Sequence, residues 1–188
     1  MLLAPRFSTV SFLWLLLVVA VQVYGVCEYC KVNQFPVLIS IEGSNHNGTN
    51  TLGFKSSIVT SDNALRLQMQ EDGNLVIVDL RGSKPLPIWA SMKFVKKGKT
   101  AEAVLDENGR LVVYDNSKNL PIWSSDFYPS FRTIQPFCVW VRSDQKHIGV
   151  SIMDSGCQLV WRAPLPSTKK EFQAFEAMWN AYNETSDF

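Results

Sequence analysis

Short runs rich in β-forming residues, separated by polar turns, follow one another along most of the chain. Residues 35–41, 51–59 and 65–69 are each predicted to form a strand. A polar loop at 42–51 and a turn at Ser61-Asp62-Asn63 separate them. Short strands at this spacing are typical of an all-β barrel, sandwich or prism.

One of these runs, residues 70–78, begins with an unusual concentration of polar side chains. Read as an extended strand with a period of two, it places three polar residues and two valines on one face: Gln70, Asp72, Asn74, Val76 and Val78. Neighbouring hydrogen-bonding groups beside apolar ones suit the hydroxyls and ring carbons of a sugar. A solvated strand edge is the alternative interpretation.

This pattern recurs along the chain. Residues 70–89 and 106–123 share a polar trio, an apolar strand, a turn and Pro-Ile-Trp followed by Ala-Ser or Ser-Ser. Their starts are 36 residues apart and their tryptophans 34 apart. A fainter third copy at 144–161 has the length of the second and places Val150 at the position of Val76 and Val112. Its polar trio would be Asp144, Lys146 and Ile148, which is no longer a sugar-binding face.

Each copy ends in a tryptophan, namely Trp89, Trp123 or Trp161. Three such units predict pseudo-threefold symmetry, with the three indoles packed together in a shared core. A set of indoles that stack on sugar is the alternative.

The run Gln70-x-Asp72-x-Asn74-x-Val76-x-Val78, followed by Ile88-Trp89-Ala90-Ser91, resembles the bulb-type (monocot) mannose-binding lectins, whose motif is Q-x-D-x-N-x-V-x-Y. The resemblance covers residues 36–165 and implies an all-β fold, the β-prism II. In that fold three antiparallel four-stranded sheets surround a pseudo-threefold axis. It also implies one potential sugar site per sheet, with neither a metal nor another cofactor.

The resemblance assigns a role to each residue of the first copy. In the family the Asp and Asn hold the mannose O2, the Gln reaches O3, the Val packs on the ring carbons and the Tyr bonds O4. The corresponding residues here are Asp72, Asn74, Gln70 and Val76, whereas Val78 replaces the tyrosine. Loss of that hydroxyl should weaken binding roughly fivefold, because a neutral hydrogen bond is worth about 1 kcal/mol.

The second copy departs further from the motif. It carries Asp106, Asn108, Arg110, Val112 and Tyr114 at the corresponding positions. Arg110 places a long cation where the family has a short carboxamide, so mannose in the usual pose would clash or tilt. Pairing of Arg110 with Asp106 in a structural face is the favoured interpretation, and recognition of an acidic sugar is the alternative.

The N-terminal residues indicate export. Residues 1–25 combine Arg6, an apolar run at 12–21 and small residues near Gly25, as in a signal peptide. Residues 26–35 form a short cysteine-containing segment before the lectin-like domain. An uncleaved anchor is the alternative. Two sequons, at Asn47 and Asn183, are consistent with a glycoprotein on a secretory route.

Four cysteines lie beyond the predicted signal peptide: Cys27, Cys30, Cys138 and Cys157. Export favours disulfides, and four cysteines allow three pairings. We expect adjacent pairing, Cys27 with Cys30 and Cys138 with Cys157. The second bridge would close a loop of about 20 residues and contribute roughly 3 kcal/mol.

Residues 166–188 are predicted to form a helical tail. Thr168 to Glu171 matches a capping box, and an aromatic and apolar stripe follows at helical spacing: Phe172, Phe175, Met178, Trp179 and Tyr182. Packing against the chain's own β domain is the simpler interpretation. A partner surface that supports a homo-oligomer is the functional alternative.

Composition narrows the function classes. The 188 residues carry a formal net charge of +1, which argues against nucleic acid as the main partner. No transmembrane stretch follows the predicted signal peptide. The two histidines, His46 and His147, lie in no nucleophile or metal-ligand motif, so we expect a protein that is not an enzyme.

The sequence therefore supports two alternative functions. The first is a secreted, extracellular lectin that binds mannose-containing glycans or glycoproteins, mainly through the first copy. The alternative is a β-prism module that has lost sugar binding and acts through protein contacts.

Overall fold

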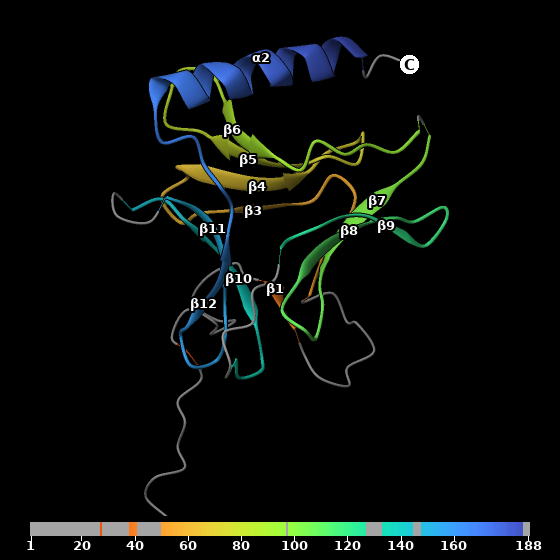
Figure 1. Cartoon of the computed structure of the whole chain (residues 1–188), viewed down its shortest axis with the longest axis vertical. Helices are drawn as coiled ribbons and strands as arrows, with labels where there is room; N and C mark the ends of the chain where they lie inside the picture. Colours follow the sequence, from red (N-terminus) through yellow and green to blue (C-terminus); the bar gives the residue numbers. More distant parts are fainter. Residues whose placement is uncertain are drawn as a thin grey trace, which may run out of the picture.

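The computed structural model describes residues 27, 38–40, 50–96, 98–126, 133–144 and 148–185, with the side chains of 182–185 left out. Within these residues, twelve strands form three antiparallel four-stranded sheets, followed by one helix (Figure 1). The predicted all-β prism with a C-terminal helix is therefore confirmed.

The first sheet is a meander of four consecutive strands, whereas each of the other two combines one early strand with a three-stranded meander from later in the chain. The first contains β3 (Ser57–Val59), β4 (Leu65–Met69), β5 (Leu75–Asp79) and β6 (Leu86–Ala90). The second contains β2 (Thr51–Leu52), β7 (Ala101–Leu105), β8 (Leu111–Asp115) and β9 (Leu120–Ser124). The third contains β1 (Leu38–Ile39), β10 (Cys138–Arg142), β11 (Gly149–Met153) and β12 (Leu159–Arg162).

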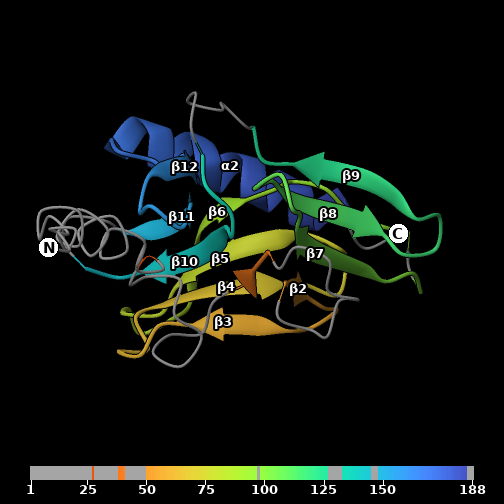
Figure 2. The same ribbon diagram turned by 90° about the horizontal axis from the view of Figure 1, so that it is seen from below.

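The three sheets surround one core, as seen from below in Figure 2. Strand alternation explains which side chains reach it: Leu65, Leu67 and Met69 of β4 are fully buried, while Arg66 and Gln68 point to the outer face. In β5, Leu75 and Ile77 belong to this core, and Val76 and Val78 to a separate cluster on the outer face.

The three repeated tryptophans meet, as predicted. The ring centroids of Trp89 and Trp123 are 5.5 Å apart, those of Trp123 and Trp161 6.0 Å, and those of Trp89 and Trp161 6.1 Å. All three pairs are edge-to-face, the arrangement that the indole quadrupole favours. The indoles pack against the shared core, which confirms the predicted packing role.

The predicted single strand at 51–59 is wrong. Thr51–Leu52 and Ser57–Val59 lie in two different sheets. Between them the chain turns, with Lys55 at φ 61° and the Ser56 amide donating to the Gly53 carbonyl at 2.9 Å. The β-forming composition of the run concealed this corner between two sheets.

The predicted alignment of the third copy is also wrong by one residue. The amides of Ser91, Ser125 and Ala163 donate to the carbonyls of Leu75, Leu111 and Val150, respectively. Val150 therefore corresponds to Leu75, and Ser151 to Val76. The β11–β12 hairpin is one residue shorter than its counterpart, because Ile152 pairs with Trp161 whereas Val113 pairs with Trp123.

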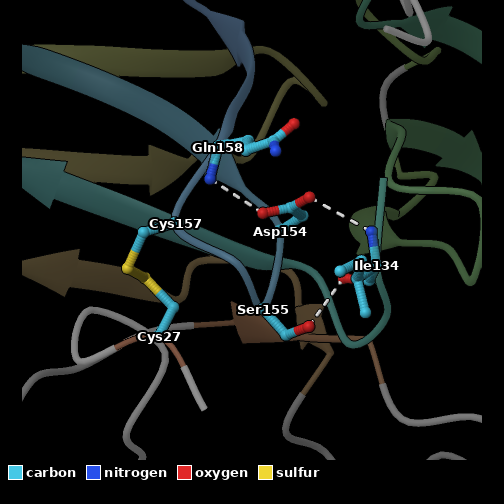
Figure 3. The surroundings of a disulfide bond; sticks show 6 residues. All are labelled: Cys27, Ile134, Asp154, Ser155, Cys157 and Gln158. Carbon is cyan, nitrogen blue, oxygen red and sulfur yellow. Dashed lines mark hydrogen bonds between the residues drawn. A yellow bond between two sulfur atoms is a disulfide. The ribbon is translucent and has the colours of Figure 1, made fainter. Parts of the chain in front are cut away.

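The expected cysteine pairing is wrong as well. Cys27 is bonded to Cys157, 130 residues along the chain (Figure 3). The Cys27 amide donates to the Ser155 carbonyl at 2.9 Å, so this residue lies against the β11–β12 turn that carries Cys157. Cys138 is also disulfide-bonded, to a partner outside the described residues.

The turn that carries Cys157 is fixed by a buried aspartate. One Asp154 oxygen accepts from the Gln158 amide at 2.8 Å, and the other accepts from the Ile134 amide at 3.1 Å (Figure 3). The Ser155 hydroxyl adds a 2.9 Å bond to the Ile134 carbonyl. The disulfide thus joins the N-terminal segment to a rigid turn of the third sheet.

Several predictions fall outside the described residues. They are the signal peptide at 1–25, Cys30, the sequon at Asn47 and both histidines, His46 and His147. Asn183 lies within the helix, but its side chain is not described.

Candidate functional site

The polar trio of the first copy lies in a turn and not in a strand. Residues 70–74 connect β4 to β5, and the Gln70 amide donates to the Asn74 carbonyl at 2.9 Å. Gly73 adopts φ 86°, and a Cβ there would lie 3.1 Å from a Val95 methyl. Glycine is thus required both by the turn and by the packing of residue 95 against it. Only the two valines of the motif lie in β5.

Asn74 is the best-fixed member of this turn. It is fully buried, and its Oδ1 accepts from the Ser91 hydroxyl at 2.9 Å and from the Met92 amide at 3.0 Å. Because a backbone amide can only donate, these bonds identify the oxygen and leave Nδ2 as the free end of the side chain. The Asn74 amide in turn donates to an Asp72 carboxylate oxygen at 2.9 Å.

Two nitrogen donors of this sheet are buried without a hydrogen-bond partner among the described residues: Asn74 Nδ2 and Arg66 Nε. Arg66 pairs in register with Val78, and its side chain lies on the same outer face of the sheet. A buried donor without an acceptor costs about 1–3 kcal/mol. Such groups in a native fold call for an explanation.

The turn of the second sheet has the same backbone geometry but a different side-chain arrangement. Arg110, at the position of Asn74, is exposed and pairs with Asp106 at 2.8 Å. Asp106 also accepts from the amides of Asn108 and Arg110. The predicted pairing of Arg110 with Asp106 is confirmed. Val112 is buried at the place of Val76, and Tyr114 is half-buried at the place of Val78.

The third sheet offers no equivalent of Asn74. Gly149 precedes Val150 there and has no side chain to donate. The β10–β11 connection is also longer than the five-residue turn of the first sheet, since Arg142 and Gly149 are its last register pair. The first sheet is thus the one described sheet in which Gln, Asp and Asn stand together.

Helix α2 (Lys169–Thr185) lies across β5 and β6 of the first sheet (Figure 1). Phe175 and Trp179 stack with centroids 6.3 Å apart and pack against Val76, Val78 and Ala90. Packing of the aromatic stripe against the chain's own β domain is confirmed for these two residues. Met178, predicted in the same stripe, is instead 49% exposed.

The predicted capping box at the start of α2 is present. The Glu171 amide donates to Thr168 Oγ1 at 3.2 Å, and the Glu171 carboxylate accepts from the Thr168 amide at 3.2 Å. The same carboxylate accepts from the Ser167 amide and hydroxyl, both at 2.8 Å. The bonds from the Ser167 amide and hydroxyl lower the pKa of Glu171 most, followed by the bond from the Thr168 amide.

Sequence reasoning missed some residues that shape this site. Ser91 and Met92 fix Asn74, and Arg66 contributes the second unpartnered donor. A signal for Ser91 existed, because a serine follows each Trp-(Ala/Ser) pair. The Ser91 hydroxyl oxygen accepts from the Leu75 amide at 3.1 Å, as that of Ser125 accepts from the Leu111 amide at 3.0 Å. The only sequence signal for Arg66 was its place in the alternation of apolar and polar residues along β4.

A pocket of about 720 Å³ adjoins the three tryptophans, lined also by residues of β9 and β12 that include Ser124, Asp126 and Arg162. Trp123 and Trp161 are half-buried and form part of its wall. None of the residues that line this pocket belongs to the 70–74 turn or to the motif at 70–78.

Across the described part of the chain, no group of three or more His, Cys, Asp or Glu side chains is placed to hold a metal ion. A search of the same residues finds no helix with the length and apolar character to cross a membrane.

No protein-family model matches the sequence, and no curated protein matches it significantly. Among solved structures, a monomeric monocot mannose-binding lectin from Gastrodia elata matches 68% of this chain and 96% of its own, with 22% identity and a TM-score of 0.50. The mannose-specific bulb lectin of Scilla campanulata (bluebell) matches 71% of this chain and 97% of its own, with 24% identity and a TM-score of 0.49. A lectin from Allium sativum matches 64% and 94%, respectively, with 27% identity and a TM-score of 0.46.

The Gastrodia match, together with the three four-stranded sheets, establishes the architecture. This chain has the β-prism II fold found in monocot mannose-binding lectins.

Proposed function

We propose that this protein is a secreted carbohydrate-binding protein that recognises mannose-type glycans through the 70–74 turn and the start of β5. The observation that carries the proposal is the Asn74 side chain. Its oxygen is held by Ser91 and Met92, and its Nδ2 is a buried donor with no partner among the described residues.

The chemistry of the turn suits a sugar with neighbouring hydroxyls. Asn74 Nδ2 donates, the Asp72 carboxylate accepts, and the half-buried Gln70 side chain does both. Val76 adds an apolar contact for ring carbons. This set orients a neutral monosaccharide by hydrogen bonds alone, without a bridging cation.

The other two sheets are weaker candidates. In the second, the ion pair with Asp106 holds Arg110 in the place of the carboxamide. In the third, Gly149 has no side chain at that place. A single competent site of this kind gives weak binding, so useful avidity on a cell surface would need several chains acting together.

The proposal of an extracellular location rests on the N-terminal signal pattern and the two sequons. The Cys27–Cys157 disulfide supports it, because disulfides persist in oxidising compartments. A homo-oligomer that uses the aromatic face of α2 would require the helix to leave its own sheet, since Phe175 and Trp179 already pack there.

A glycan array probed with the full-length mature protein tests the proposed function. We expect a signal on mannose-type glycans that is lost in Gln70→Ala. Asn108→Ala is the matched control, because Asn108 is an exposed polar residue of the corresponding turn in the second sheet. A mannose signal that survives Gln70→Ala and disappears in Asn108→Ala would move the site to the second sheet.

A second candidate function is supported by the same face of the first sheet. Val78 replaces the motif tyrosine, and the cluster that it forms with Val76 and Ala90 binds a helix in this structure. A β-prism that binds amphipathic helices of other proteins would use this cluster. The absence of any glycan signal, with α2 docked or released, would favour this candidate.

A further inference from the structure

We infer that α2 is a displaceable cover of the proposed sugar site, so that glycan binding and helix docking compete for one face of the first sheet. The inference deepens the proposed function and rests on it. It assigns a regulatory role to the C-terminal helix, which the sequence pattern alone left between packing and partner binding.

The helix occupies the surface that the sugar ring would need. Phe175 and Trp179 pack against Val76, Val78 and Ala90, and Val76 is the residue proposed to contact the ring carbons. Val112, the equivalent of Val76, is itself only 3% exposed, so burial alone would not reveal a cover. The direct contact with two aromatic rings is what excludes a sugar from the same valine.

The docked helix complements the apolar part of the face and not its polar part. Met92, whose amide bonds to Asn74 Oδ1, packs against the same apolar cluster as Phe175 and Trp179. Yet Asn74 Nδ2 and Arg66 Nε stay buried with no acceptor among the described residues. A surface built only to hold this helix would be expected to satisfy or avoid those donors. A glycan hydroxyl can accept from them.

The limited burial of the helix against the sheet also favours its release. Phe175 and Trp179 are only half-buried, and the intervening positions from 176 to 178 are exposed. The helix follows the last strand, β12, so that its departure breaks no sheet. C-terminal elements with few buried apolar contacts are those that open most readily in native proteins.

Competition has a thermodynamic consequence that runs in both directions. If only the open form binds sugar, the apparent dissociation constant exceeds the intrinsic one by the inverse of the open fraction. Bound sugar must then lower the occupancy of the docked helix by the same coupling.

The test is a calorimetric or NMR titration of the full-length mature protein with methyl α-mannoside. The variant Phe175→Glu/Trp179→Glu places two charges against the apolar cluster and releases the helix. Met178→Glu is the control, since Met178 is 49% exposed on the same helix and the substitution adds one such charge outside the contact with the sheet. Unchanged thermal unfolding of the β domain verifies that both variants fold.

We expect the double variant to bind methyl α-mannoside at least about tenfold more tightly than the wild type, and Met178→Glu to bind like the wild type. Tenfold corresponds to about 1.4 kcal/mol. Equal or weaker binding by the double variant would overturn the cover while leaving sugar binding intact. If neither protein binds, both the cover and the proposed function are overturned.

Hydrogen exchange gives a second measurement. If the helix had a purely structural role, its amide exchange rates would not rise on sugar binding. Saturating methyl α-mannoside should speed amide exchange in α2 of the wild type, because the sugar displaces the helix. Slower exchange, or no change at saturation, would show that the helix and the sugar do not compete.

Discussion

At the scale of single residues, the turns at 70–74 and 106–110 share a backbone and differ in what the fifth position does. Asn74 is buried and held by Ser91 and Met92, whereas Arg110 is exposed and bound to Asp106. The main-chain bonds that close the turns are the same in both, from the first residue to the fifth. One side chain therefore decides whether the turn presents a fixed amide donor or a neutralised cation.

The replacement of the motif tyrosine by Val78 leads to a prediction at this scale. Val78→Tyr should bind methyl α-mannoside about fivefold more tightly than Val78→Phe, because one neutral hydrogen bond is worth about 1 kcal/mol. The Phe variant is the control, since both rings disturb the packing of α2 to the same extent. Titration calorimetry measures the difference. Equal affinities would show that no sugar hydroxyl lies within reach of position 78.

The motif residues themselves could be predicted from the sequence, but their conformation could not. A period of two places Gln70, Asp72 and Asn74 on a strand face, whereas Gly73 at φ 86° places them in a turn. Over nine residues, the same alternation of residue types is compatible with one continuous strand and with a tight turn that leads into a strand. Arg66 illustrates a further limit: its unpartnered Nε depends on burial that only the folded structure shows.

At the scale of elements, the N-terminal end of α2 depends on one carboxylate. Glu171 accepts from Ser167 and Thr168, and these bonds lower its pKa below the ordinary 4.5. A group whose folded-state pKa is lowered contributes stability above its unfolded pKa. That contribution is lost as the pH falls through the lower, folded-state value.

We therefore expect helicity of α2 to fall on acidification below pH 4.5 more steeply in the wild type than in Glu171→Gln. Glutamine retains the capping geometry and does not titrate. Amide exchange within α2, measured from pH 6 to roughly pH 3, separates this helix from the β domain. The same pH dependence in both proteins would assign the acid response to other groups.

The packing of α2 was only partly predictable. The capping box follows from local sequence and was correct, and the aromatic spacing was correct for Phe175 and Trp179. The choice of docking face depends on residues more than 80 positions away, since Trp179 packs with Ala90 and Val76. The exposure of Met178, which lies next to Trp179, shows that the helix turns a narrower stripe to the sheet than its apolar residues suggest.

At the scale of the whole molecule, the threefold repeat was predictable because the tryptophans recur at similar spacing and pack on one another. The path between sheets was not, since 51–59 reads as one strand and serves two sheets. Disulfide pairing was also beyond the sequence, because a contact between residues 27 and 157 depends on the place of Cys27 beside the β11–β12 turn.

The Cys27–Cys157 bond closes a loop of 130 residues and ties residue 27 to the third sheet. Its removal should lower the free energy of unfolding by about 2–5 kcal/mol, because the unfolded chain regains conformational freedom. Chemical denaturation of Cys27→Ser, Cys157→Ser and the double variant measures this. The three should lose similar stability, since each lacks the same bond. A double variant much less stable than either single variant would show that the two cysteines act separately.

The central claim, that the first sheet holds the sugar site, is tested most directly by NMR chemical-shift mapping. The protein, labelled with ¹⁵N, is titrated with methyl α-mannoside while backbone amides are followed. The account predicts shifts at residues 70–74, at Met92 and along α2, with residues 106–110 unaffected. Shifts confined to the pocket beside Trp123 and Trp161, or no shifts at saturating sugar, would contradict it.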